Sequence, residues 1–479
     1  MERPDIILVR ECEPYTREEL LSIFAVDSEE WPQLAERLEH YNMLRRRSTV
    51  ATDELSGSEF EKHLSDAYEF SLRFVGVYIH RKRVIWSMPK YMHFSENKSH
   101  LEHKVERQNG VADKLSTVMS VLRRYTNGKL KEALNCQNPV RSDDYLSLLI
   151  YIVTDFAHNG VYRDDVYEER LNGRGRVLWH KTIQSTKPYI QGNKPCYMDL
   201  VVRRTIEDEE NFFTRLHLKI VADCQHILDD IGLIKLFALP RVDEIEEHNQ
   251  DLGNVNYLEY CIHGELRNQF DSRRRHILLM MLNYLRCQTN HHHKALEEIV
   301  YGSTSFYAVW EEVCREVLGK DYRKEYRIAF PEWQFVGHNE WFGPQDSLEP
   351  DIIIERKDSI WLFDAKYYHP RVNNGKVSQL PGVQDVTKQF LYQKDLQKNK
   401  ANFKKIFNAF LMPMPDAYSS ECEGNISLFA RVSMPLFGDC VIYSYFLRPQ
   451  EMYEAYLHVE KREAIQKQME SMLNKEIGA

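Results

Sequence analysis

The chain lacks the features that mark several classes of protein. Its nine cysteines are scattered and never occur as Cys-x-x-Cys, so neither a zinc cluster nor a disulfide framework is indicated. No apolar run is long enough to cross a membrane, and the first residues show no signal-peptide pattern. We therefore expect a cytoplasmic protein without a membrane partner.

Two further absences concern function. No Gly-x-x-x-x-Gly-Lys-Ser/Thr sequence occurs, so the chain carries no P-loop motor of its own. An excess of positive charge is also missing: the formal net charge is −9, which argues against a protein that coats nucleic acid non-specifically. The 479 residues are enough for two or three globular domains, and we find no internal repeat or low-complexity linker.

What the sequence does contain is an acidic motif around two short apolar runs. Pro350 and Asp351 precede the first run, and Asp364, Ala365 and Lys366 follow the second. Runs of this length around a charged centre indicate a β-hairpin whose strands are buried on both faces. We expect residues 356–359 to form its turn.

The register of this hairpin follows from a symmetric turn. If Lys357 and Asp358 are central, Asp351 lies opposite Asp364, with Cβ atoms about 5 Å apart. Lys366, two residues later, emerges on the same face. Two carboxylates at that separation repel each other, and a divalent cation relieves the repulsion. We therefore predict Mg²⁺, with Mn²⁺ as a substitute, held by Asp351, Asp364 and the carbonyl of Ala365.

This arrangement predicts a hydrolytic reaction. A bound metal lowers the pKa of a coordinated water and neutralises charge on a pentavalent phosphate. Lys366 would orient the attacking water or stabilise the developing negative charge. Phosphodiester hydrolysis is the natural reaction for such a set of groups.

The motif resembles the PD-(D/E)xK nuclease motif, and Asp364-Ala-Lys-Tyr367 is similar to the sequence in McrC and LlaJI-type restriction nucleases. Four other segments are similar to parts of the same family: 302–314, 385–392, 173–183 and 75–91. The resemblance implies a magnesium-dependent endonuclease subunit of a restriction system that acts on double-stranded DNA. It further implies a McrB-like AAA+ GTPase as partner, and it admits a cognate DNA methyltransferase in the same system.

Two helices are expected around the motif. From Phe306 an amphipathic stripe runs to Leu318, with Gly319 as C-cap. The family pattern favours Glu311 on this helix as a further carboxylate at the metal, and a solvated glutamate is the alternative. On the later helix Gln389 and Tyr392 share a face with Asp385 and Leu396.

Gln389 and Tyr392 are predicted to contact substrate phosphate or brace Lys366, Gln389 as part of the catalytic site and Tyr392 as a DNA contact. A plain packing helix is the alternative. The related nucleases often show Gln-x-x-x-Tyr, whereas this chain has Gln-x-x-Tyr.

Two basic clusters are candidate binding surfaces. The lysines after the motif are predicted to follow a DNA backbone, namely Lys394, Lys398, Lys404 and Lys405. The tip of a hairpin at 74–88 is the predicted contact for the GTPase, through Arg81, Lys82 and Arg83. In both clusters a solvated polar surface is the alternative.

These elements predict an α/β (α+β) protein in three parts. We expect a mixed N-terminal domain over residues 1–140, a mostly helical middle region over residues 141–294, and a nuclease domain with a PD-(D/E)xK core over residues 295–479. The resemblance implies that the N-terminal domain is the region that can dock on the motor. A charged helix over 451–475 ends the chain. Two other functions remain open, a non-catalytic adaptor that binds DNA or regulates the motor, and a repair or RNA-directed nuclease on the same fold.

Overall fold

The computed structural model is mixed α/β, as the sequence predicts. It divides into two compact units, Met1–Thr126 together with Lys294–Ala479, and Asn127–His293. The residues described are 5–46, 69–80, 83–92, 111–135, 145–163, 165–192, 194–207, 211–230, 234, 239–241, 252–291, 298–319, 322, 325–326, 332–337, 339–343, 349–373, 376–399, 403, 405–418 and 424–475.

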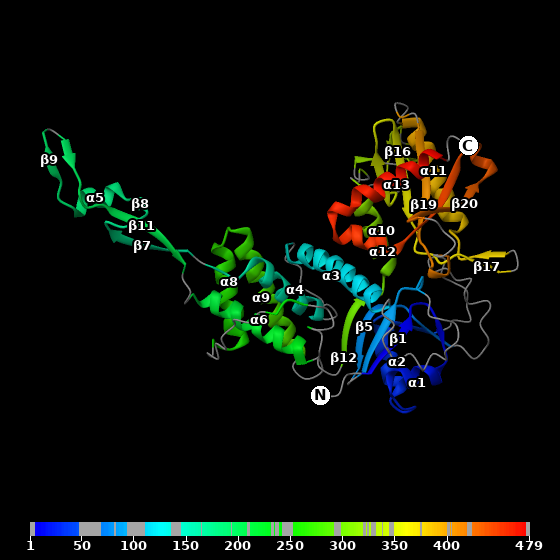
Figure 1. Ribbon diagram of the computed structural model, residues 1–479, viewed down its shortest axis with the longest axis horizontal. Helices are drawn as coiled ribbons and strands as arrows, with labels where there is room; N and C mark the ends of the chain where they lie inside the picture. The colour runs from blue at the N-terminus through cyan, green and yellow to red at the C-terminus, as the bar shows by residue number, and fades with distance from the viewer. Residues whose placement is uncertain are drawn as a thin grey trace. The chain divides into compact units, whose positions relative to one another are not determined.

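A four-stranded sheet combines three strands from the first 88 residues with one strand from much later in the chain (Figure 1). Its order is β1 (Asp5–Arg10), β6 (Arg83–Met88), β5 (Val75–His80) and β12 (Glu298–Ser303). The predicted hairpin at 74–88 is therefore present as β5 and β6. Strand β12 pairs antiparallel with β5, so the predicted nuclease domain supplies a strand to the N-terminal sheet. The predicted separation of residues 1–140 from 295–479 is corrected accordingly.

Two glycines allow this distant pairing. Gly76 lies opposite Gly302 in the β5–β12 ladder. A Cβ on Gly76 would lie 2.2 Å from the Tyr301 carbonyl oxygen and 2.9 Å from the ring of Phe74, closer than real Cβ contacts. The strands approach this closely because neither position carries a side chain.

The N-terminal sheet is covered by small elements from the first 72 residues. Helix α1 (Arg17–Phe24) begins with a capping box, in which Thr16 and Glu19 each accept a hydrogen bond from the other's backbone N–H. Helix α2 (Trp31–His40) follows, and a second sheet has the order β2 (Pro14–Tyr15), β4 (Phe70–Leu72) and β3 (Leu44–Arg46). Their apolar side chains form one buried cluster around Phe24, Trp31 and Tyr78.

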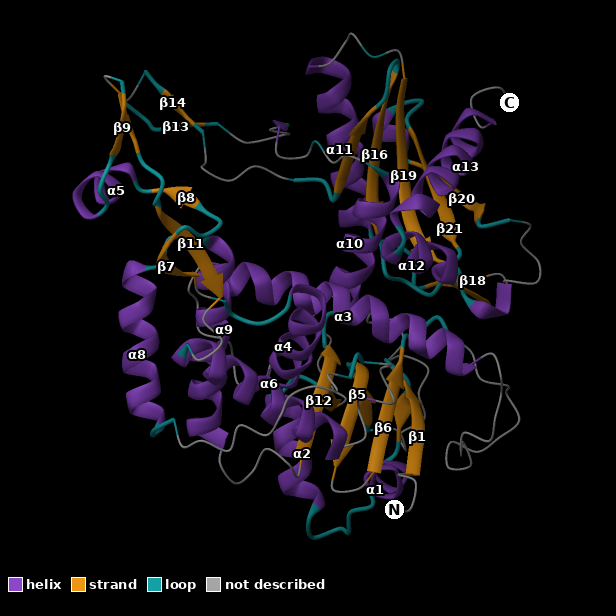
Figure 2. Cartoon of the chain, turned by 60° about the vertical axis from the view of Figure 1, so that its left-hand side comes forward, coloured by secondary structure: helices purple, strands orange, loops and turns teal. Residues whose placement is uncertain are grey.

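A five-stranded mixed sheet contains the motif (Figure 2). Its order is β15 (Ile352–Glu355), β16 (Ser359–Ala365), β19 (Lys405–Pro413), β21 (Val441–Leu447) and β20 (Ile426–Ser433). The three central strands are parallel, and the two outer strands are antiparallel to their neighbours. Helix α11 (Val383–Asn399) connects β16 to β19, as a parallel pair requires.

Helices cover both faces of this sheet, which explains the continuous apolar runs of its strands. Helix α11 packs on the face formed by residues such as Leu362 and Phe410. Helix α10 (Phe306–Leu318) packs on β16 and against α12 (Pro449–Leu457) and α13 (Arg462–Lys475). The single helix predicted over 451–475 is wrong, because the chain leaves helical geometry at His458 and forms a 3-10 turn before α13.

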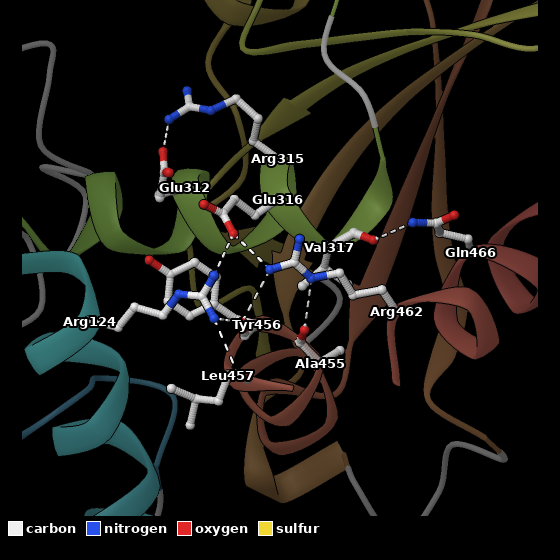
Figure 3. Close-up of polar contacts among 10 residues, drawn as sticks. All are labelled: Arg124, Glu312, Arg315, Glu316, Val317, Ala455, Tyr456, Leu457, Arg462 and Gln466. Carbon is white, nitrogen blue, oxygen red and sulfur yellow. Dashed lines mark hydrogen bonds and ion pairs between the residues drawn. The ribbon is translucent and has the colours of Figure 1, made fainter. Parts of the chain in front are cut away.

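A cluster of ion pairs, here called the arginine seam (Arg124, Glu316, Tyr456 and Arg462), joins helix α3 (Val111–Asn135) to helices α10, α12 and α13 (Figure 3). Oε2 of Glu316 lies 3.0 Å from Nη2 of Arg124 and 2.7 Å from Nη2 of Arg462. The guanidinium of Arg124 also lies 4.5 Å from the ring centroid of Tyr456. Residues far apart in sequence thus meet around one carboxylate.

The middle unit is helical in part. Helices α4 (Tyr145–Asn159), α6 (Phe212–Asp230), α8 (Val255–Asn268) and α9 (Ser272–His291) pack together. Residues 165–207 depart from that prediction and form an arm of short strands. The arm contains β7 (Asp165–Leu171), β8 (Arg176–Val177), α5 (Trp179–Ser185), β9 (Tyr189–Gln191), β10 (Lys194–Cys196) and β11 (Val201–Glu207).

The remaining elements among the described residues are short. They are β13 (Trp333–Gln334), β14 (Trp341–Phe342), β17 (Arg371–Asn373), β18 (Lys376–Ser378) and three 3-10 turns (Asp416–Tyr418, Pro435–Phe437 and Val459–Lys461). Within the described ranges, no helix has the length and apolar character needed to span a membrane.

Candidate active site

The motif hairpin consists of β15, β16 and the residues at their open end. Ile352 lies opposite Phe363, and the turn is closed by a hydrogen bond of 2.8 Å from Arg356 N to Ser359 O. One step further in the same register, Asp351 lies opposite Asp364. The register predicted from a symmetric turn is therefore confirmed.

At this end Asp364 is buried and Asp351 is partly buried, and their charges interact. Oδ2 of Asp351 accepts a hydrogen bond of 3.0 Å from the backbone N–H of Ala365. Burial, with the charge of Glu311, raises the pKa of Asp351 to about 6. Burial, with the charge of Asp351, raises the pKa of Asp364 to about 7. The charge of Asp351 thus favours protonation of Asp364, as expected for two acids in one site.

Lys366 lies between two carboxylates. Its Nζ is 3.0 Å from Oδ2 of Asp364 and 2.9 Å from Oδ1 of Asp385. Burial alone would lower the pKa of Lys366, but the charges of Asp364 and Asp385 outweigh it and raise the pKa. The ammonium therefore keeps its proton, which suits electrostatic stabilisation rather than proton abstraction.

Asp385 and Tyr368 belong to the site but were not predicted as site residues. Oδ2 of Asp385, on the first turn of α11, accepts a hydrogen bond of 3.4 Å from the hydroxyl of Tyr368. The sequence contains one signal for Asp385, its place on the same helical face as Gln389. The sequence contains no such signal for Tyr368, because its hydrogen-bond partner Asp385 lies on a helix later in the chain.

Glu311 lies near Asp351 but forms an ion pair with another residue. Its charge raises the pKa of Asp351, while its Oε1 is 3.2 Å from Nη1 of Arg315, one turn along α10. Among the described residues, no three His, Cys, Asp or Glu side chains are arranged to hold a metal ion.

The oxygen donors at the site are therefore Asp351, Asp364 and the expected Ala365 carbonyl. Oδ2 of Asp364 is buried, and the Lys366 ammonium is the sole donor near it in the described part of the chain. Hard oxygen ligands of this kind fit Mg²⁺, which is commonly bound through one or two carboxylates and keeps several waters.

Gln389 and Tyr392 face the interior of the protein. Each side chain is 1% exposed. Gln389 Nε2 donates a hydrogen bond of 3.4 Å to the carbonyl of Leu362, and the Tyr392 hydroxyl donates one of 3.1 Å to the carbonyl of Glu349. The predicted DNA contact of Tyr392 is not supported, because its hydroxyl is used to fix the chain just before Pro350. Both residues fit the packing alternative.

Comparison with known proteins identifies the family. The family model described as LlaJI restriction endonuclease matches residues 74–434, which is more than half of the chain. The chain belongs to this family. A curated relative is the type II restriction enzyme BsuMI component YdjA of Bacillus subtilis (strain 168), which is 26% identical over 391 residues covering 80% of each protein.

Two solved structures are more distantly similar. A chain in the assembly of Thermococcus gammatolerans McrB AAA+ hexamers with bound McrC is 12% identical over 94% of this chain and 99% of that chain, with a TM-score of 0.39. A chain in the McrBC complex of the same organism is 14% identical over 58% of this chain and 81% of that chain, with a TM-score of 0.19.

The basic residues of this LlaJI-family chain have different surroundings. Lys394, Lys398 and Lys405 are exposed, whereas Lys404 lies outside the described residues. Lys388, which was not predicted, is exposed on α11, and its charge lowers the pKa of Asp351. An exposed lysine of α11 thus acts electrostatically on one of the two carboxylates.

At the predicted partner contact, Arg81 and Lys82 lie outside the described residues. Arg83 donates hydrogen bonds to the backbone carbonyls of Ser22 and Ile23, the latter at 3.2 Å. Those carbonyls belong to the last turn of α1, where a cation is favourable. Arg83 thus has a structural partner within the chain.

Proposed function

We propose that this LlaJI-family chain is a magnesium-dependent DNA endonuclease subunit of a restriction system, with a PD-(D/E)xK active site. The observation that carries the proposal is the open end of the motif hairpin. There, one step beyond the paired strands, the partly buried Asp351 lies opposite the buried Asp364, and Lys366 is held as a cation beside them.

The residues of the site have distinct proposed roles. Asp351 and Asp364, with the Ala365 carbonyl, would hold Mg²⁺ or Mn²⁺, which supplies an acidic water and neutralises phosphate charge. The Lys366 ammonium, held by Asp364 and Asp385, would face the negative charge that develops on the phosphate oxygens. Gln389 would support this site by bracing Leu362 on β16.

A multi-part system follows from the proposed role. The sequence contains no P-loop, and the Bacillus relative is itself a component of its restriction enzyme. We therefore propose a McrB-like AAA+ GTPase as partner and double-stranded DNA as substrate, with a cognate methyltransferase in the same system. The exposed Lys394, Lys398 and Lys405 would contact the DNA backbone.

The test uses the full chain with its GTPase, GTP, Mg²⁺ and double-stranded DNA. Asp364→Ala and Lys366→Ala should each abolish cutting, because one removes a metal ligand and the other the compensating cation. Asp358→Ala is the matched control, since Asp358 is an exposed carboxylate at the turn of the same hairpin.

Calorimetry with Mg²⁺ separates the roles further. We expect Asp364→Ala to lose metal binding and Lys366→Ala to retain it. Cleavage that survives in both variants would exclude the proposed active site. A wild-type chain that binds no Mg²⁺ at these carboxylates would instead indicate the non-catalytic adaptor.

A further inference from the structure

Tyr367, the residue after the motif lysine, is held by the N-terminal sheet. Its hydroxyl donates a hydrogen bond of 2.7 Å to Oε2 of Glu11 and accepts one of 3.3 Å from the backbone N–H of Lys90. Glu11 follows the last residue of β1, and Lys90 follows β6 closely. Strands β1 and β6 are parallel neighbours, so their C-terminal ends lie at the same edge of the sheet. Glu11 and Lys90, which follow these ends, therefore lie close together.

The surroundings of Tyr367 are closely packed. The ammonium of Lys90 lies 4.5 Å from the centroid of the Tyr367 ring and 6.0 Å from that of Tyr368. Phe306 and Tyr91 pack on the Tyr367 ring, with centroids at 5.4 and 6.2 Å. These contacts restrict the ring on several sides.

The hydroxyl of Tyr91 is hydrogen-bonded in turn to that of Tyr453 on α12, at 2.6 Å. Glu11, Lys90, Tyr91, Tyr367 and Tyr453 are here called the tyrosine seam.

Successive residues of the motif are held from opposite sides. Lys366 and Tyr368 both contact Asp385 of α11, whereas Tyr367 between them contacts Glu11 and Lys90. This alternation is the one expected of an extended segment. Displacing Tyr367 would therefore displace the backbone that carries the Lys366 ammonium.

We propose that Glu11 and Lys90 are positioning residues for the Lys366–Tyr368 segment, so that DNA cleavage requires the N-terminal sheet to be seated against the motif. This inference rests on the proposed nuclease function of Lys366. Glu11 supplies an acceptor and Lys90 a backbone donor and a cation for the same side chain. Neither residue contacts Asp351 or Asp364 in the described contacts, so their effect passes through Tyr367.

The first experiment removes one hydroxyl at a time from the full chain. Tyr367→Phe deletes the bonds to Glu11 and Lys90, and Tyr453→Phe deletes a buried hydroxyl of the same seam that does not touch the motif. Hydrogen exchange followed by mass spectrometry should show faster exchange of amides 366–368 in Tyr367→Phe and no change there in Tyr453→Phe. This readout requires no cleavage.

The second readout is the kinetics of cleavage with the GTPase, GTP and Mg²⁺. Tyr367→Phe should lower kcat about tenfold or more, because small displacements of a catalytic group are costly, and it should leave KM for DNA unchanged. Tyr453→Phe should keep the wild-type kcat. If both variants behave alike in exchange and in kcat, the hydroxyl of Tyr367 has no positioning role and the inference is wrong.

Rescue at Glu11 completes the design. Glu11→Ala should reproduce the Tyr367→Phe defect, and Glu11→Gln should restore most of the activity, because an amide oxygen also accepts a hydrogen bond. Equal defects in the two variants would contradict the positioning role. Failure of the nuclease assignment is distinguishable, because it appears as cutting by Asp364→Ala, whatever the exchange at residues 366–368.

Discussion

The tyrosine seam and the arginine seam join the same two parts of the first unit, yet they differ in physical character. In the tyrosine seam, Glu11 is 7% exposed and bonds to hydroxyl and backbone groups. In the arginine seam, the side chains of Arg124 and Glu316 are each 35% exposed and interact chiefly by charge. One seam lies directly beside the motif, and the other joins α3 to α10 and α13.

This difference determines what each seam contributes. A buried polar group that loses its partner bears the full cost of its desolvation, so buried networks fix one geometry. Half-exposed ion pairs are screened by water and salt and contribute little each. We infer that the contacts of Glu11 and Lys90 with Tyr367 in the tyrosine seam set the position of the motif, whereas the arginine seam adds modest stability.

The largest expected effect is the loss of the Tyr367 side chain. Tyr367→Ala should lower the free energy of unfolding by about 3–5 kcal/mol, because it opens a cavity beside Phe306 and leaves Glu11 without its hydroxyl donor. Urea unfolding measures the change. Tyr307→Ala is the control, since that ring is exposed on the same α10. A loss below about 1 kcal/mol for Tyr367→Ala would contradict a tightly packed seam.

The second effect depends on pH and metal. In the metal-free protein, Asp364 has a folded pKa of about 7, above its unfolded value of about 4. Below pH about 4 both states are protonated, and as pH rises the unfolded state releases a proton that the folded state retains. The contribution of Asp364 to stability therefore falls between pH about 4 and about 7.

The variant Asp364→Asn tests the direction of this pH dependence of stability. Without metal, the variant should be more stable than wild type at pH 8, and the advantage should shrink towards pH 4. Each unit of pKa difference corresponds to about 1.4 kcal/mol. Saturating Mg²⁺ should reverse the order, because wild type alone keeps both carboxylates. Thermal unfolding in EDTA and in Mg²⁺ gives both comparisons, and a wild-type advantage at pH 8 in EDTA would disprove the repulsive pair.

The sequence predicted what depends on local pattern. Two apolar runs around a four-residue turn specify both the hairpin and its register. The position of Asp351 opposite Asp364 could therefore be predicted. The stripe from Phe306 to Leu318 predicted α10 for the same reason. Contacts between distant segments were not predictable, because no local period specifies that β12 pairs with β5 or that Tyr367 meets Glu11.

Helix α11 shows why site residues were partly misassigned. Gln389 and Gln393 are buried, although polar residues usually indicate a solvent face. Both belong to a network in which buried Asn408 donates hydrogen bonds of 3.2 Å to the Gln389 carbonyl and 2.8 Å to Gln393 Oε1. The polar pattern therefore did not indicate which face of the helix is buried. As a result, Tyr392 was predicted to contact DNA, and Asp385 was not predicted as a site residue.

The smallest expected effect concerns the arginine seam. Glu316→Gln weakens both ion pairs, to Arg124 and Arg462, while it preserves the shape of the side chain. We expect a loss of about 1 kcal/mol at low salt, because exposed and half-exposed pairs rarely contribute more. At about 1 M NaCl, where the Debye length is about 3 Å, most of that loss should disappear.

The salt dependence sharpens the contrast between the seams. The stability change of Tyr367→Phe should be nearly the same at low and high salt, since its bond to Glu11 is buried, whereas that of Glu316→Gln should shrink. Urea unfolding of both variants at two salt concentrations measures this. If Glu316→Gln kept its full effect in high salt, the carboxylate would act by hydrogen bonding in a desolvated site. The arginine seam would then be a second positioning contact, because Arg124 and Arg462 would fix α3 against α10 as firmly as Glu11 fixes Tyr367.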